Sequence, residues 1–129
     1  MQSPHDKILY EYALVRFIPR VERGECINIG LVMMCKRRRW LRARFAIEED
    51  RLRAFAPGAD IDALRRQVEA FERCAAGCPG PIGELEAHER FRWLTAVRSA
   101  SLGTSRPHPG LCTDLDTTFN RLFTDLVTP

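Results

Sequence analysis

Three polar residues near the N-terminus stand where they could do chemistry. Arg16 and Asn28 each interrupt a stretch that is otherwise apolar, and Glu25 is the acid nearest to Asn28 in the sequence. If the two stretches pair antiparallel around Gly24, Arg16 and Glu25 would form a buried or half-buried ion pair. Such a pair could bind an anionic ligand. It could also only fix the register of the strands, because polar groups on a sheet usually satisfy each other.

A second polar segment lies near the C-terminus. Arg98 and His108 bracket it, and it contains Thr104 and Ser105. A histidine beside hydroxyl groups could act as a general acid or base, so His108 is the candidate catalytic residue. The flanking prolines could equally fix the shape of a loop and leave His108 as a capping or packing group. The candidate binding face therefore consists of Arg16, Glu25, Asn28, Arg98 and His108.

The most basic segment is residues 36–44, which hold six positive charges and no negative one. This segment could bind nucleic-acid phosphates, with Trp40 as a stacking surface. The alternative is a solvated turn and a sheet edge kept soluble by charge. Acids at residues 48–50 and a modest net charge of +3 favour this alternative. The nucleic-acid candidates are Arg37, Arg38, Arg39, Arg42 and Arg44.

The five cysteines are an odd number, which argues against a closed disulfide framework, and we predict none. Cys74 and Cys78 are one helical turn apart and could both bind a metal, but His88 and His108 are isolated from them in the sequence. We therefore expect no metal and no cofactor. The sequence contains no phosphate-binding glycine loop and no His-Glu-x-x-His motif. It favours a non-enzymatic protein, with a small enzyme as an alternative.

The length of 129 residues predicts one domain over residues 1–129, with an ordered core of about 8–127. The longest apolar run, residues 30–35, is far shorter than the ~20 residues that a membrane-spanning helix needs. The N-terminal residues lack a basic segment followed by an apolar one, which a signal peptide would have. We therefore expect a cytoplasmic protein.

Three strands are predicted first, at residues 9–18, 26–35 and 40–47, and their short connections indicate a meander. Residues 26–35 are almost continuously apolar, which is typical of a central strand covered on both faces. Residues 40–47 alternate. Leu41, Ala43 and Phe45 face one way, and Arg42 and Arg44 face the other.

Helices are predicted next, at residues 48–56, from an N-cap at Asp60, and at residues 84–96. Residues 97–105 could form a fourth strand. The prolines of residues 106–110 predict irregular backbone, and Asp114 can cap a last helix. The fold class is therefore α+β. An N-terminal antiparallel sheet of three to four strands packs with three to four helices from the C-terminal two-thirds.

Several segments together resemble a known family. They are residues 10–19, 23–25, 27–30, 91–94, 98–99 and 108–112. Their sequences are similar to those of a small bacterial family of uncharacterised proteins, domain of unknown function 3037, over about residues 8–127. Cys26 stands where the family has an aromatic residue, and Leu102-Gly103-Thr104 replaces a more strand-like segment.

The resemblance implies the same α+β fold and no established activity. It also implies a protein partner, kinase-like and of the toxin–antitoxin type, encoded nearby. We expect a non-enzymatic accessory or binding module of a bacterial cytoplasmic system that docks on another protein. The alternatives are nucleic-acid binding through residues 36–44, and a small enzyme or anionic-ligand site at the candidate binding face.

Overall fold

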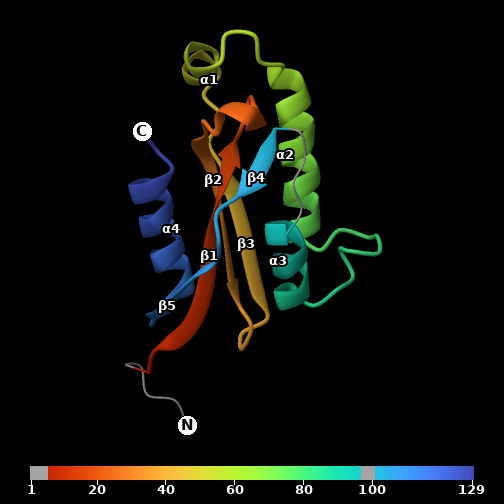
Figure 1. Cartoon of the computed structure of the whole chain (residues 1–129). Helices are drawn as coiled ribbons and strands as arrows, with labels where there is room; N and C mark the ends of the chain where they lie inside the picture. The colour runs from red at the N-terminus through yellow and green to blue at the C-terminus, as the bar shows by residue number, and fades with distance from the viewer. Residues whose placement is uncertain (1–5, 97–100) are drawn as a thin grey trace.

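The computed structural model describes residues 6–96 and 101–129, apart from the side chain of Val21. Within these residues, five strands form one antiparallel sheet and four helices pack around it, which confirms the α+β class with one more strand than predicted (Figure 1). The strands are β1 (Ile8–Phe17), β2 (Ile27–Cys35), β3 (Trp40–Phe45), β4 (Leu102–Thr104) and β5 (His108–Cys112). The helices are α1 (Glu49–Phe55), α2 (Ile61–Ala75), α3 (Ala87–Ala96) and α4 (Leu115–Leu126), with a short 3₁₀ turn, η1 (Val21–Arg23).

The strand order is β3-β2-β1-β4, and β5 also pairs with β1. The predicted meander of the first three strands is therefore confirmed. β4 and β5 share the second edge of β1, because β4 pairs with residues 15–17 and β5 with residues 8–12. β1 thus lies between β2 on one side and two short strands on the other.

Ser105 joins the two short strands along that edge. Its backbone N–H donates to the Leu14 carbonyl at 2.9 Å, and its Oγ accepts from the Leu14 N–H, also at 2.9 Å. Ser105 is buried. A hydroxyl oxygen therefore takes the place of a ladder carbonyl where the chain passes from β4 to β5.

β5 corrects the prediction of irregular backbone at residues 106–110. It is an edge strand, where a proline such as Pro109 is tolerated because its missing N–H can face away from the neighbouring strand. The ring of Tyr10 lies against Gly110, its Cα partner, and a Cβ at Gly110 would stand 2.4 Å from the ring carbon Cζ and from the hydroxyl oxygen of Tyr10. Glycine at this position therefore lets the aromatic ring cover the strand.

Helices lie on both faces of the sheet (Figure 1), and each face carries a hydrophobic core. On one face α1, α2 and α3 contribute buried side chains such as Leu52, Phe71 and Phe91. On the other face α4 packs Phe119 and Phe123 against β1 and β2. β2 is buried on both faces over residues 29–35, as its apolar sequence predicts.

The helix termini follow the predicted capping residues. Asp60 Oδ1 accepts from the Ala63 N–H at 3.0 Å, and Asp114 Oδ1 accepts from the Thr117 N–H at 3.2 Å. α2 ends in a Schellman motif, in which Gly77 has a φ of 77° and the N–H of Cys78 donates to the Arg73 carbonyl at 3.1 Å. This motif turns the chain sharply at the end of α2.

Among the described residues, no helix is long and apolar enough to cross a membrane.

Candidate functional site

The predicted polar face does not assemble as one site. Arg16 and Asn28 are Cα partners across β1 and β2, and Arg16 Nε donates to Asn28 Oδ1 at 3.2 Å. Asn28 Nδ2 in turn donates to the carbonyl of Leu126 at 3.3 Å, at the last residue of α4. These two residues therefore connect the sheet to the end of α4.

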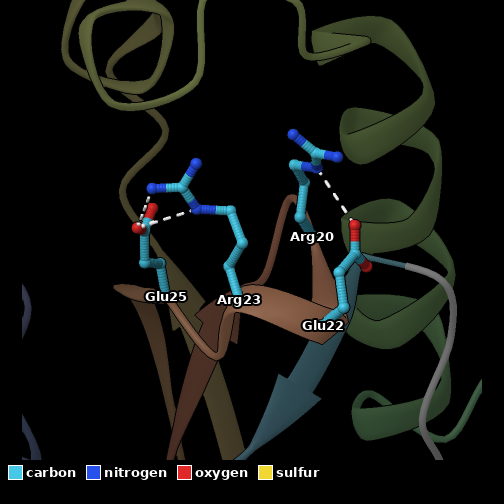
Figure 2. A network of polar contacts seen from close by, with 4 residues as sticks. All are labelled: Arg20, Glu22, Arg23 and Glu25. Carbon is cyan, nitrogen blue, oxygen red and sulfur yellow. Dashed lines mark hydrogen bonds and ion pairs between the residues drawn. The ribbon is translucent and has the colours of Figure 1, made fainter.

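The predicted ion pair between Arg16 and Glu25 is wrong. Glu25 pairs instead with Arg23, whose Nε and Nη2 lie 3.0 and 2.7 Å from Glu25 Oε1. Figure 2 shows this pair beside that of Arg20 and Glu22, in the connection between β1 and β2. Arg23 is two residues from Glu25 in the same turn, so it reaches the carboxylate without crossing the ladder. Both partners of this pair are about half exposed.

His108 lies apart from the other predicted residues. It is exposed on β5, and its ring centroid is 5.3 Å from that of Tyr12, its Cα partner on β1. Tyr12 and Arg16 are four residues apart along β1, which is roughly 14 Å at ~3.4 Å per residue. Arg98 lies outside the described residues.

The predicted nucleic-acid residues divide into two groups. Arg37, Arg38 and Arg39 are exposed on the turn between β2 and β3, where Arg39 adopts a φ of 50°. Arg42 and Arg44 face α4, with their guanidinium carbons 4.6 and 4.5 Å from the ring centroids of Phe119 and Phe123.

Arg42 also pairs with Asp116 on α4, with 3.2 Å between Nη1 and Oδ1. The alternation in residues 40–47 correctly predicts that Arg42 and Arg44 face away from Leu41 and Ala43. It does not predict the helix that they meet. These two arginines contact the protein's own helix α4.

A pocket that the sequence did not predict lies between α2, α3 and β4. Its volume is about 420 Å³, and one wall is the connection from Cys78 to Gly83. Trp93 is 41% exposed at this pocket, whereas Phe71, Leu94 and Leu102 are buried. The side chains that give the pocket its apolar character are Phe71, Cys74, Ile82, Trp93, Leu94 and Leu102. We call this space the α2–α3 pocket.

The wall of the α2–α3 pocket is fixed by close backbone packing. A Cβ at Gly83 would lie 1.7 Å from the carbonyl oxygen of Cys78, so only glycine fits there. Arg90 of α3 donates to the carbonyls of Leu85 at 2.6 Å and Ala75 at 3.4 Å. These contacts hold the connection between α2 and α3 against both helices.

Two polar side chains at the α2–α3 pocket bond to the protein itself, and Arg73, which also lines the pocket, is exposed. Gln67 Nε2 donates to Ser101 Oγ at 3.1 Å, and Thr104 Oγ1 donates to the Thr95 carbonyl at 3.0 Å. Burial raises the pKa of the Cys74 thiol, and the nearby Arg90 opposes this effect only in part. Cys74 is therefore protonated at neutral pH, and the pocket is suited to an apolar group.

One signal in the sequence does point to this pocket. Trp93 lies between Phe91 and Leu94, but it is off the buried stripe that those two residues form. A large aromatic residue beside a Pro-Gly-Pro connection at residues 79–81 can indicate an open apolar surface as well as helix packing.

Within residues 6–96 and 101–129, one group of side chains could offer ligands to a metal ion. Ligand atoms of Glu86, His88 and Glu89 all lie within 4.8 Å of one another at the start of α3. His88 is therefore not isolated, because its Nδ1 is 3.5 Å from Glu86 Oε2. Both glutamates are exposed, and a helix N-terminus disfavours a cation.

All five cysteines are free thiols.

Comparison with protein families matches residues 12–127 to the family described as "Protein of unknown function (DUF3037)". No curated protein matches the sequence. No solved structure matches it either.

Proposed function

The chain belongs to the DUF3037 family, and we propose that it is a protein-binding module that receives an apolar side chain of its partner in the α2–α3 pocket. The observation that carries this proposal is the pocket itself, about 420 Å³ and open beside a partly exposed tryptophan. Interface hot spots are typically large apolar or aromatic anchors that fill such pockets.

The energetics of Trp93 support an occupied pocket. Apolar surface transferred out of water contributes roughly 25 cal/mol per Å², and Trp93 leaves 41% of its surface in water. A partner side chain in the pocket would cover the indole and the apolar wall formed by Ile82 at the same time. The proposal is for non-enzymatic binding, because His108, the candidate acid or base, packs on the ring of Tyr12 and lies apart from Arg16 and Asn28.

The free thiols support a reducing compartment as the place of this binding. Cys26 and Cys78 are exposed and unpaired with one another, and exposed thiols persist where glutathione keeps them reduced. We therefore propose the bacterial cytoplasm as its location, with the family resemblance as further support. The kinase-like partner that the resemblance implies is the first candidate occupant.

A pocket-filling variant tests the proposal. Ala70 of α2 is exposed and lines the pocket, so Ala70→Phe should place a ring over it without disturbing the core. Ala54→Phe, on the exposed surface of α1, adds the same ring elsewhere. The measurement is quantitative affinity capture from the native cell with wild type and both variants.

We expect wild type and Ala54→Phe to retain the same partner and Ala70→Phe to lose at least nine-tenths of it. A partner retained equally by all three proteins would overturn the proposal. An apolar small molecule that co-purifies with wild type and not with Ala70→Phe, detected by native mass spectrometry, would also overturn it in favour of a ligand-binding protein.

A further inference from the structure

We infer that the outer edge of β3 accepts an extended acidic segment of a partner protein as a sixth strand of the sheet. This surface is separate from the α2–α3 pocket, and the inference does not depend on the proposed function. β3 is the terminal strand in the order β3-β2-β1-β4, and among residues 6–96 and 101–129 no strand pairs with its outer edge. An exposed edge of this kind is a template for strand addition.

The direction of the β3 backbone groups follows from its pairing with β2. The N–H of Ala46 donates to the Ile29 carbonyl at 2.8 Å, and the register continues with Arg44 opposite Leu31. Residues in antiparallel strands alternate between inward and outward backbone groups. The N–H groups of Leu41, Ala43 and Phe45 therefore point out of the sheet, where an added strand would accept them.

The opposite edge of the sheet is less suited to strand addition. It consists of two short strands, and Pro107 and Pro109 interrupt its backbone donors. β3 has six residues in regular pairing and contains no proline. Of the two sheet edges formed by the described residues, β3 therefore offers a partner strand the more continuous set of donors and acceptors.

Positive charge selects the kind of strand that β3 can receive. Lys36 and the three arginines after it are exposed on the adjoining turn, and Arg42 and Arg44 project from the α4 side of β3. Of Arg42 and Arg44, it is Arg42 whose charge is paired with Asp116. Opposite charges on neighbouring strands are favourable and like charges are unfavourable. The edge therefore favours a partner strand that carries acidic residues.

The same charges disfavour a second copy of this chain. Strand pairing through the outward groups of β3 would set Ala43 opposite its own copy. Arg42 would then stand opposite Arg44 of the second copy, because cross-strand partners share one face of the sheet. The preferred occupant has acidic side chains opposite Arg42 and Arg44. Its alternate apolar residues lie opposite Leu41 and Ala43, which are half-buried on the other face.

Amide hydrogen exchange of the full chain, followed by NMR, tests this inference directly. The probe is an eight-residue peptide of alternating Glu and Val with blocked termini. We expect exchange at Leu41, Ala43 and Phe45 to slow at least tenfold at saturating peptide. Exchange at Arg42 and Arg44 should change little, because their N–H groups already bond to β2. A peptide with four Glu followed by four Val is the control and should protect none of these amides.

Two variants separate backbone pairing from charge. Ala43→Pro removes an outward N–H and leaves the bonds to β2, so peptide affinity should fall at least tenfold while the melting temperature changes little. Arg44→Glu should lower the affinity for the Glu-Val peptide at least fivefold. It should also strengthen binding of an alternating Lys-Val peptide relative to wild type. If Ala43→Pro does not fold, the exchange pattern of wild type still decides the question. Ala70→Phe should bind the Glu-Val peptide as wild type does, whatever happens at the pocket.

Three results would overturn the inference. One is equal binding of the alternating and block peptides. Another is protection of the three amides that rises with protein concentration in the absence of peptide, which would indicate self-association. The third is a single-stranded oligonucleotide that displaces the Glu-Val peptide and itself leaves the three amides exchanging freely, because the peptide would then be held by charge alone.

Discussion

The two faces of the sheet are closed to different degrees. On the α4 face, Arg42 and Arg44 cover the rings of Phe119 and Phe123, and Asn28 bonds to the end of the helix. On the opposite face, α2 and α3 leave a pocket of about 420 Å³ between them. The same sheet thus supports a sealed core on one face and an open one on the other. The difference teaches that a face with a well-packed core can still leave room for the partner side chain of the proposed function.

The largest expected effect separates the sealed core from the open one. Phe119 is fully buried on the α4 face, so Phe119→Ala should lower the free energy of unfolding by about 3–5 kcal/mol. Trp93→Ala, at the pocket, should cost less than about 2 kcal/mol because the indole is already partly in water. Urea denaturation measures both. Equal losses would mean that the two faces do not differ in this way.

A smaller effect tests how α4 is held at its end. Asn28→Ala removes the acceptor of Arg16 and the donor to the Leu126 carbonyl, and should cost about 1–2 kcal/mol in the free energy of unfolding. Arg23→Ala is the matched control, since it breaks an exposed pair with Glu25 and should leave that free energy unchanged. A larger loss for Arg23→Ala than for Asn28→Ala would show that Asn28 does not hold the end of α4.

A substitution in the turn before β3 should raise the stability of the protein. Arg39 adopts a left-handed φ of 50°, which is unfavourable for a residue with a Cβ and natural for glycine. Arg39→Gly should raise the free energy of unfolding by up to about 1 kcal/mol, reduced by the greater freedom of glycine in the unfolded chain. Arg37→Gly, in the same turn, should give no gain. Thermal denaturation of both variants checks the sign.

The smallest expected effect concerns binding of the protein to nucleic acid. Arg42 and Arg44 stack on rings of α4, and the turn residues Arg37, Arg38 and Arg39 are exposed in a short segment followed by acids. We expect no measurable binding to a mixed-sequence duplex at physiological salt. Fluorescence anisotropy measures this. Sub-micromolar binding that weakens with salt, and that replacement of the three turn arginines by serine abolishes, would contradict the expectation.

The fold was predictable where its signals are local. The alternation in residues 40–47, the apolar run of β2 and the caps at Asp60 and Asp114 each depend on a few adjacent residues, and all are confirmed. β5 was missed because its prolines predict irregular backbone unless the strand is known to lie at an edge. Edge position is a property of the whole sheet, so it cannot be read from residues 106–110.

The candidate site was less predictable for the same reason. Glu25 was expected to pair across the ladder, but the nearer Arg23 takes its carboxylate. The α2–α3 pocket depends on how α2, α3 and β4 meet, and on Arg90 and Gly83 fixing the connection between the helices. Such contacts join residues distant in the chain. The sequence showed only that Trp93 is a large aromatic residue on a helix.

The shared edge of β1 also has a consequence for synthesis of the chain. Leu14 and Ser105, which bond at that edge, are 91 residues apart in the sequence. At roughly 5–20 residues per second, a ribosome leaves this side of β1 without its partners for roughly 5 to 20 seconds after Leu14 is made. The meander with β2 can form early, but the β4–β5 side of the sheet is completed among the last events of folding. Pairing between residues so distant in the chain slows folding relative to local contacts.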